Sequence, residues 1–270
     1  MLKLMRADIY RIIRGKTLYV TFAVLLIFNF LLGVSWQMVY DGTAEVHESA
    51  DVSAATTAIV SETGVTGIQM PGLLASSMES FVFFLLPIIV ITAAAIFSDN
   101  TVKNDLAWGV SRTKLYLAKL LVASALGLLM LLLYMGTGML IGTLAGGFGG
   151  PAPAGHWVNL LQVLSAQLFM LIAVTAFGVF LVFTTKRTAA VNGVYIAFIL
   201  VPSLIIQLLM MSNPNFSRLL DFDLPTNINR LANLRWLETY EILRALGIGA
   251  FYLLASTIGG IALFRKAEIK

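Results

Sequence analysis

Six long apolar runs constrain this chain more than any other feature of its sequence. A helix needs about 20 apolar residues to cross the ~30 Å hydrocarbon core of a bilayer. The runs occupy residues 18–39, 74–97, 115–145, 158–183, 189–211 and 245–264. Only 12% of the residues are charged, about half the share found in a soluble domain, so a water-soluble fold is unsuited to this chain. We expect an all-α, polytopic membrane protein with six transmembrane helices in a single domain, residues 1–270.

Most of the positive charge lies at the two termini and in alternate connections between these runs. All but four of the 18 lysines and arginines lie before the first run, in or near the second connection (residues 98–114), in the fourth connection, or after the last run. The exceptions are Arg218, Arg230, Arg235 and Arg244. Lysine and arginine are retained on the cytoplasmic side of a membrane. Both termini and residues 98–114 are therefore predicted to be cytoplasmic, and residues 40–73 and 212–244 extracellular.

The segments outside the runs differ in character. Residues 1–16 place Leu2, Met5 and Ile9 on one helical face, which predicts an amphipathic helix in the inner membrane interface, either as a plain anchor or with a functional role. Residues 40–73 are small, polar and acidic, and predict a flexible loop. Residues 212–244 combine prolines with large apolar residues, and predict short helices that lie at the outer surface or dip back into it.

Catalytic and metal-binding groups are sparse. The chain has no cysteine, and its two histidines, His47 and His156, are far apart in sequence, which argues against thiol chemistry and a metal site. Lys119, near the inner end of the third run, can snorkel toward the headgroups. The Gly-Lys-Thr sequence at residues 15–17 imitates the end of a P-loop, but Tyr10 stands where that motif needs its first glycine. We expect no enzymatic activity, no cofactor bound by this chain and no nucleic-acid partner.

Uncharged polar and small residues interrupt the runs. The amides inside them are Asn29, Gln37, Gln162, Gln167, Asn192 and Gln207. Such side chains hydrogen-bond across helices, which is the default interpretation here, although they could also line a substrate path. Rows of small residues favour close packing within the chain over a subunit interface. These rows are Gly138, Gly142 and Gly146 in the third run, and Ser256 with Gly260 in the sixth.

A charged segment separates the second and third runs. Residues 101–108 can form two helical turns, Gly109 can end them in a left-handed conformation, and Ser111 can cap the next helix. A short, rigid helix that presents charge and Trp108 to the cytosol indicates a docking surface for a cytosolic partner. A merely solvated connector is the other interpretation of the same residues.

The run NDLAWGVSRTKLYLAKLL, residues 104–121, resembles the segment between the second and third spans of ABC-2 type transport permeases. The opening MLKLMRADIYRIIRGKTLY and the ending ALFRKAEIK are also similar to that family. Asn100 departs from the family, which commonly has glycine at this position. The resemblance covers essentially the whole chain and is greatest to small bacterial permeases of peptide-antibiotic or bacteriocin immunity and peptide export.

This resemblance implies the ABC-2 (type V exporter-like) permease fold, a location in the bacterial plasma membrane, and a connecting helix over residues 1–16. It also implies pairing with a second permease subunit, identical or different, among membrane lipids, and export of an amphipathic substrate such as an antimicrobial peptide, another peptide, a drug or a lipid. ATP and Mg²⁺ would be bound by a cytosolic ABC ATPase subunit. The coupling segment implied for that subunit comprises Thr101, Val102, Lys103, Asn104, Asp105, Leu106, Trp108, Gly109, Ser111 and Arg112.

Two other functions remain open from the sequence. An ion-coupled secondary transporter or channel would use ionisable groups at mid-membrane depth, which the apolar runs lack. A non-transporting scaffold or sensor would use the same charged segment to dock a cytosolic partner without moving a substrate.

Overall fold

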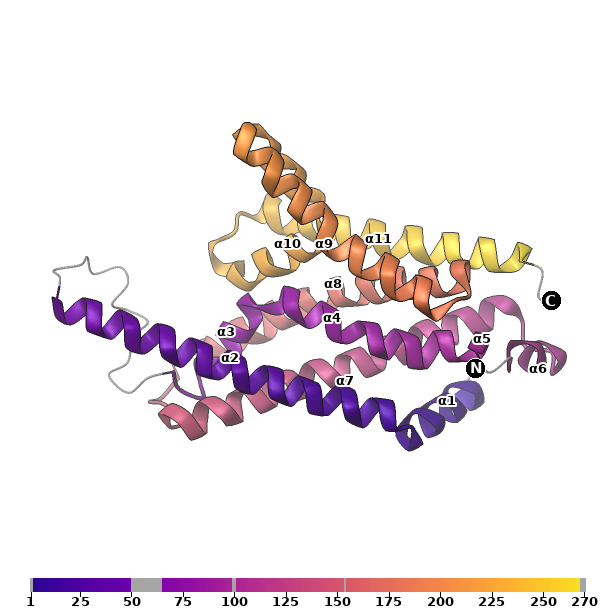
Figure 1. Cartoon of the computed structure of the whole chain (residues 1–270), viewed down its shortest axis with the longest axis horizontal. Helices are drawn as coiled ribbons and strands as arrows, with labels where there is room; N and C mark the ends of the chain where they lie inside the picture. Colours follow the sequence, from indigo (N-terminus) through magenta and orange to yellow (C-terminus); the bar gives the residue numbers. More distant parts are fainter. Residues whose placement is uncertain (1, 50–64, 99–100, 153, 268–270) are drawn as a thin grey trace.

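The computed structural model describes residues 2–49, 65–98, 101–152 and 154–267 of the chain. Within these ranges the regular secondary structure is helical, without a strand, and six helices are long and apolar enough to cross a membrane. Figure 1 shows the long helices gathered into one elongated bundle. The predicted all-α architecture with six spans is confirmed.

The six spans match the predicted runs and extend beyond most of them. They are α2 (Lys16–Ser49), the series α4 (Met78–Ile89), π-turn η2 (Val90–Ala94) and α5 (Ala95–Ser98), α7 (Arg112–Gly146), α8 (His156–Thr185), α9 (Thr188–Ser212) and α11 (Thr239–Lys266). The shorter elements are α1 (Leu2–Arg14), α3 (Met70–Ser76), α6 (Thr101–Ala107), 3-10 segment η3 (Pro214–Phe222), α10 (Leu224–Arg230) and 3-10 segment η4 (Leu231–Trp236).

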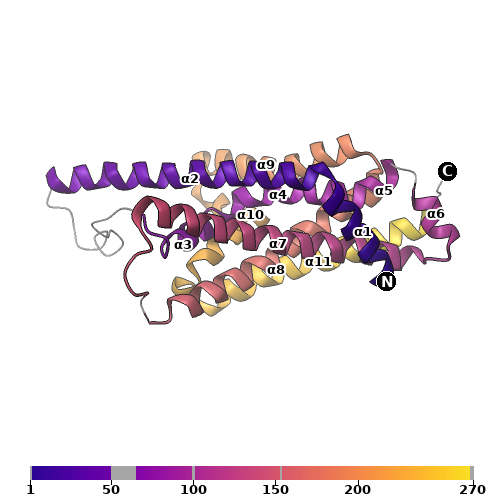
Figure 2. The same cartoon turned by 90° about the horizontal axis from the view of Figure 1, so that it is seen from below.

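The centre of the bundle is formed by α7 and α8, whose inward side chains interlock with those of neighbouring helices. Phe183 of α8 lies 4.9 Å from Tyr116 of α7 and 4.7 Å from Phe264 of α11, between ring centroids, and all three residues are buried. By contrast, α2, α9 and α11 remain largely exposed and lie around this centre (Figures 1 and 2). Their exposed apolar faces suit contact with lipid.

The two ends of the bundle carry different elements. Both termini, α1 and α6 lie at one end, whereas α3 and α10 lie toward the other (Figures 1 and 2). The same-end placement of the termini and α6 agrees with the charge pattern of the connections. The positive-inside rule predicts that this end is cytoplasmic.

The second span is interrupted, although the sequence predicted one continuous run over residues 74–97. α3 ends at Ser76 and α4 begins at Met78, with Ser77 between them at φ −107° and ψ 18°. Pro87 lies inside α4, and η2 begins three residues after it. Proline lacks an N–H donor and clashes with the preceding turn, and a π-turn is one way in which a helix continues past such a disturbance. Hydropathy does not register the π-turn because the side chains on both sides of it are apolar.

The sequence predicted a flexible loop over residues 40–73, but part of this range is helical. α2 continues as a helix to Ser49, and α3 begins at Met70, while residues 50–64 lie outside the described part of the chain. The end of the first apolar run at residue 39 therefore marks a change of composition and not the end of the helix.

Small residues on α7 allow α3 to pack closely. A Cβ atom added to Gly138 would lie 2.1 Å from Leu74 Cδ1, and one added to Gly142 would lie 3.0 Å from Met70 Cβ. Met70 and Leu74 are fully buried there. The predicted use of this glycine row for packing within the chain is confirmed at these two positions.

The segment between α9 and α11 folds into short helices that cover the end of the bundle opposite α6. The predicted short helices are therefore present, and Leu224, Ile228 and Leu231 pack them into the protein, where all three are buried. The Gln167 amide of α8 donates hydrogen bonds to the Ala75 and Ile228 carbonyl oxygens, at 2.8 and 3.0 Å. One buried side chain thus ties α3 and α10 to the central helix.

Candidate functional site

The short helix α6 is fixed to the bundle at its beginning. Val102 is 3% exposed and belongs to the hydrophobic core, and Leu106 packs against that core. The Thr101 hydroxyl donates a hydrogen bond to the Ile96 carbonyl of α5, at 3.4 Å. These contacts hold α6 against the end of the second span and leave Lys103 and Ala107 exposed.

The end of α6 has the local structure that the sequence predicted. Gly109 adopts the left-handed region at φ 78°, and its N–H donates to the Leu106 carbonyl at 3.0 Å. Ser111 is the N-cap of α7, and its hydroxyl accepts a hydrogen bond from the Lys114 N–H at 3.4 Å. A glycine stop followed by a serine cap fixes the direction of both helices, which confirms this part of the prediction.

Two of the predicted docking residues are displayed on the surface beside the stop. Lys103 is exposed, and Trp108 exposes 85% of its surface. The side chains of Asn104 and Asp105 lie outside the described part of the structure, although both residues belong to α6. Protein interfaces are enriched in large aromatic residues such as tryptophan, so the exposed Trp108 is the feature of α6 that favours a docking surface.

Arg112 has a role inside the chain. Its Nη1 atom donates to the carbonyl oxygens of Phe264, Arg265 and Ala267, at 3.0, 2.7 and 2.7 Å. These carbonyls belong to the last turn of α11 and the residue after it, where a helix has no N–H donors of its own and carries partial negative charge. Arg112 therefore joins the start of α7 to the end of α11, which a local sequence pattern could not reveal.

Lys119 does not snorkel toward the headgroups, as the sequence analysis expected. It is 1% exposed, and its Nζ lies 2.6 Å from Asp8 Oδ1 in α1. Asp8 is itself buried. The sequence carried a signal for this pair, because Asp8 lies three residues after Met5 and four before Ile12, on the apolar face of an amphipathic helix.

The six amides proposed for a substrate path differ in their contacts and exposure. Asn29 donates to the Tyr134 carbonyl (3.0 Å) and the Thr137 hydroxyl (2.6 Å) and thereby joins α2 to α7. Gln167 joins α8 to α3 and α10, as described above. Gln162 and Gln207 are exposed, and Asn192 is half-buried. For Asn29 and Gln167 the structure supports pairing between helices.

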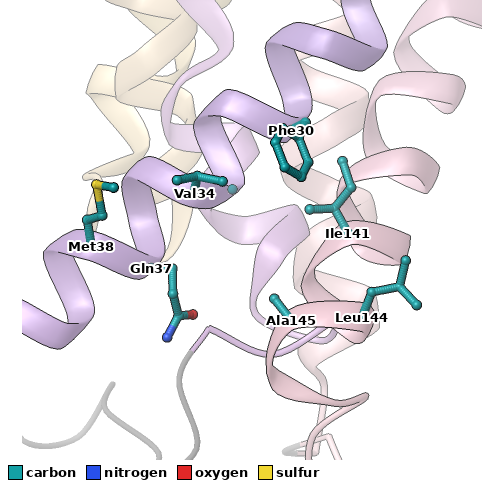
Figure 3. Close-up of a pocket in the computed structure, with 8 residues that line it drawn as sticks. Phe30, Val34, Gln37, Met38, Ile141, Leu144 and Ala145 are labelled. Atoms are coloured by element: carbon teal, nitrogen blue, oxygen red, sulfur yellow. The ribbon is translucent and has the colours of Figure 1, made fainter.

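Gln37 lines an open apolar cavity between α2 and α7, with a volume of about 490 Å³. Phe30, Val34 and Met38 of α2 form one side, and Ile141 and Leu144 of α7 form the other (Figure 3). The Gln37 side-chain oxygen accepts a hydrogen bond from the Val65 N–H at 3.2 Å. The cavity offers apolar walls and one amide, which suits a ligand with both apolar and polar parts.

Within residues 2–49, 65–98, 101–152 and 154–267, no three His, Cys, Asp or Glu side chains come together as metal ligands would. Among the side chains whose burial the structure describes, the buried charged ones are Asp8, Lys119 and Asp223. Asp223 accepts hydrogen bonds from the N–H and the hydroxyl of Thr226, at 3.1 and 2.6 Å, at the start of α10. It therefore acts as a helix cap.

Comparison with known protein families gives a match over most of the chain. The profile of the family described as "ABC-2 family transporter protein" matches residues 4–204, well over half of the chain. The matched region runs from α1 into α9 and includes α6. No curated protein matches the sequence.

Proposed function

The chain belongs to the ABC-2 family of transporters, and from this premise we propose that it is the permease subunit of an ATP-driven exporter. It is a multi-pass membrane protein with six spans, and the bacterial plasma membrane is the usual location of this family. In the proposed complex a cytosolic ABC ATPase binds ATP and Mg²⁺, and a second permease subunit, identical or different, completes the pathway.

The observation that carries the proposal is the construction of α6. Val102 anchors this helix in the core, whereas Lys103 and Trp108 are exposed beside a glycine stop and a capped helix start. A plain connector between two spans needs none of these constraints. A helix that is fixed on one side and exposes an aromatic residue on the other suits a partner that delivers mechanical work, because a rigid contact transmits displacement into the bundle.

The placement of the charged residues supports an energy source outside the chain. Ion-coupled carriers place carboxylates or other ionisable groups in the membrane interior, where they are costly and serve function. Among the described residues, the buried charges are the mutually paired Asp8 and Lys119 and the capping residue Asp223. None of the three is positioned as an isolated proton or ion site in a span, which favours an ATP-driven mechanism.

An amphipathic substrate is the class that best suits the apolar surfaces of this bundle. The cavity between α2 and α7 has apolar walls with Gln37 at its edge (Figure 3). The sequence resemblance to small permeases of peptide-antibiotic or bacteriocin immunity supports an antimicrobial peptide as the first substrate to assay, with other peptides, drugs and lipids as the alternatives.

The proposal is tested by purifying the tagged chain from its native cells and measuring copurified ATP hydrolysis with and without amphipathic peptides. Wild-type protein is expected to retain an ABC ATPase whose hydrolysis the substrate stimulates. The variant Lys103→Glu/Trp108→Ala is expected to lose this ATPase while still inserting in the membrane, because it removes the exposed cation and ring that a partner would contact.

Trp236→Ala is the matched control, since Trp236 exposes 88% of its surface and ends η4, which directly follows α10. α10 lies toward the opposite end of the bundle from α6 (Figure 1). This variant is expected to keep the ATPase. Retention of the ATPase by both variants would refute docking through α6. An ATPase that copurifies but never drives substrate movement would favour the scaffold or sensor function.

A further inference from the structure

The N-terminal helix α1 contacts both of the spans that lead into and out of α6. On one side, Asp8 Oδ1 lies 2.6 Å from Lys119 Nζ of α7. On the other side, Arg11 Nη2 lies 3.5 Å from the Ile91 carbonyl oxygen in η2. Because η2 and α5 precede α6 and α7 follows it, α1 bridges the two legs of the hairpin that presents α6.

The contact to α7 is buried. Lys119 is 1% exposed, and Ile12, one turn after Asp8, is also buried against the bundle. A buried charge is tolerated only when it is paired, and removal of one partner leaves the other uncompensated. The ion pair therefore holds α1 in one position and orientation on α7.

The contact to the second span falls on its least regular part. Ile91 belongs to η2, which follows Pro87, and π-turns frequently accompany functional sites in helices. Arg11 and Ile91, with Ile12, Gly15 and Leu18, also border a cavity of about 180 Å³ between η2 and the joint of α1 and α2. Open space beside an irregular turn allows this part of the span to shift without forcing packed side chains together.

The far end of α1 leads directly into the first span. The Gly15 N–H donates to the carbonyl oxygens of Arg11 and Ile12, at 3.1 and 3.0 Å, and α2 begins at Lys16. A displacement of α1 is therefore passed to α2, which forms one wall of the open cavity with Gln37 (Figure 3).

We propose that Asp8 and Lys119 are positioning residues whose ion pair straps α1 across both legs of the α6 hairpin and so transmits the motion of α6 to the first span. This inference rests on the proposed function, in which an ATPase moves α6. The pair touches neither ATP nor substrate, and it acts through the position of α1.

The first arm of the test follows α1 in the purified permease alone. The chain has no cysteine, so Tyr10→Cys, at a position of α1 that is 56% exposed, accepts a single spin label whose mobility is read from its electron paramagnetic resonance spectrum. Asp8→Asn, Lys119→Met and the uncharged pair Asp8→Asn/Lys119→Met are compared in this background. We expect a more mobile label in all three. Lys114→Met is the control, because it removes an exposed lysine from α7, the helix that carries Lys119, and it is expected to leave the mobility of the label unchanged.

The second arm measures the ratio of substrate moved to ATP hydrolysed in proteoliposomes that contain the complete complex. The strap variants are expected to keep their bound ATPase and hydrolysis, while this ratio falls by about 5-fold or more, a size taken from the lower end of the coupling free energies between two binding sites. The exchanged pair Asp8→Lys/Lys119→Asp is expected to restore part of the ratio. A residue that only stabilised the fold would lower hydrolysis and transport together.

The uncharged double variant keeps the test decisive if a single variant fails to insert, because it leaves neither Asp8 nor Lys119 as a buried charge without its partner. Arg11, which also lies 3.7 Å from Asp8, is partly exposed and stays solvated. An immobile α1 label in that double variant, or an unchanged ratio, would overturn the strap. A complex without any ATPase would instead refute the proposed function, and the label would still report whether the pair positions α1.

Discussion

Gly260 on α11 lies against the ring of Tyr116, and this contact illustrates how single residues set the spacing of the bundle. A Cβ atom on Gly260 would lie 2.5 Å from Tyr116 Oη and 2.6 Å from two atoms of its ring. The ring is fully buried, and its hydroxyl donates to the Ser256 carbonyl at 3.1 Å. Neither partner has room to move, so the absence of a side chain at residue 260 determines how closely α7 and α11 approach.

Gly260→Ala is expected to destabilise the protein by about 1–3 kcal/mol, the usual cost of adding a methyl group to a packed interior. Gly247→Ala is the matched control on the same helix, where a Cβ would meet no atom within 4 Å. Thermal unfolding of both variants in detergent measures the difference. Equal midpoints for Gly260→Ala and the wild type would contradict the packing described here.

For polar residues, the sequence predicted the role of some side chains but not their partners. The amides Asn29 and Gln167 were expected to pair helices, and their hydrogen bonds agree with that default. Lys119 was placed wrongly, because the length of its side chain allowed snorkelling and its partner Asp8 is 111 residues away. Such long-range pairing depends on the packed arrangement of helices, which composition does not determine.

At the scale of elements, α6 and its flanks were the most predictable part of the site. Gly109 and Ser111 act through backbone conformation and local hydrogen bonds, which depend on a few neighbouring residues. The break at Ser77 and the π-turn after Pro87 were less accessible to prediction. A proline disturbs a helix, but the form of the disturbance depends on contacts with other helices. The extension of α2 to Ser49 was missed because polar residues can continue a helix beyond an apolar run.

Gly109→Ala tests whether the geometry of this element matters. The left-handed conformation of Gly109, at φ 78°, costs roughly 1–2 kcal/mol for a residue with a Cβ atom, whereas no neighbouring atom would obstruct that Cβ. We expect weaker retention of the ATPase in copurification, and recovery in Gly109→Asn, because asparagine tolerates this conformation better. Equal loss in both variants would show that the glycine acts through something other than backbone conformation.

At the scale of the whole molecule, the elements at the two ends of the bundle agree with the match to the ABC-2 family. The end with both termini carries α6, α1 and the ion pair, and the opposite end is covered by α3 and α10 (Figures 1 and 2). Six spans and their order followed from hydropathy because each apolar run must be buried in lipid or protein. The tilt and packing of the spans did not follow, since lipid and protein interiors are similarly apolar.

The central claim is that α6 meets a cytosolic ATPase, and site-specific photo-crosslinking tests it most directly. A photoreactive phenylalanine analogue replaces Trp108 or, as the control at the opposite end, Trp236, in cells that produce the native complex. The account predicts a crosslink from residue 108 to a protein with ATP-binding motifs, and none from residue 236. A crosslink to that protein from residue 236 alone would contradict the account, because α6 would then lie on the wrong side of the membrane.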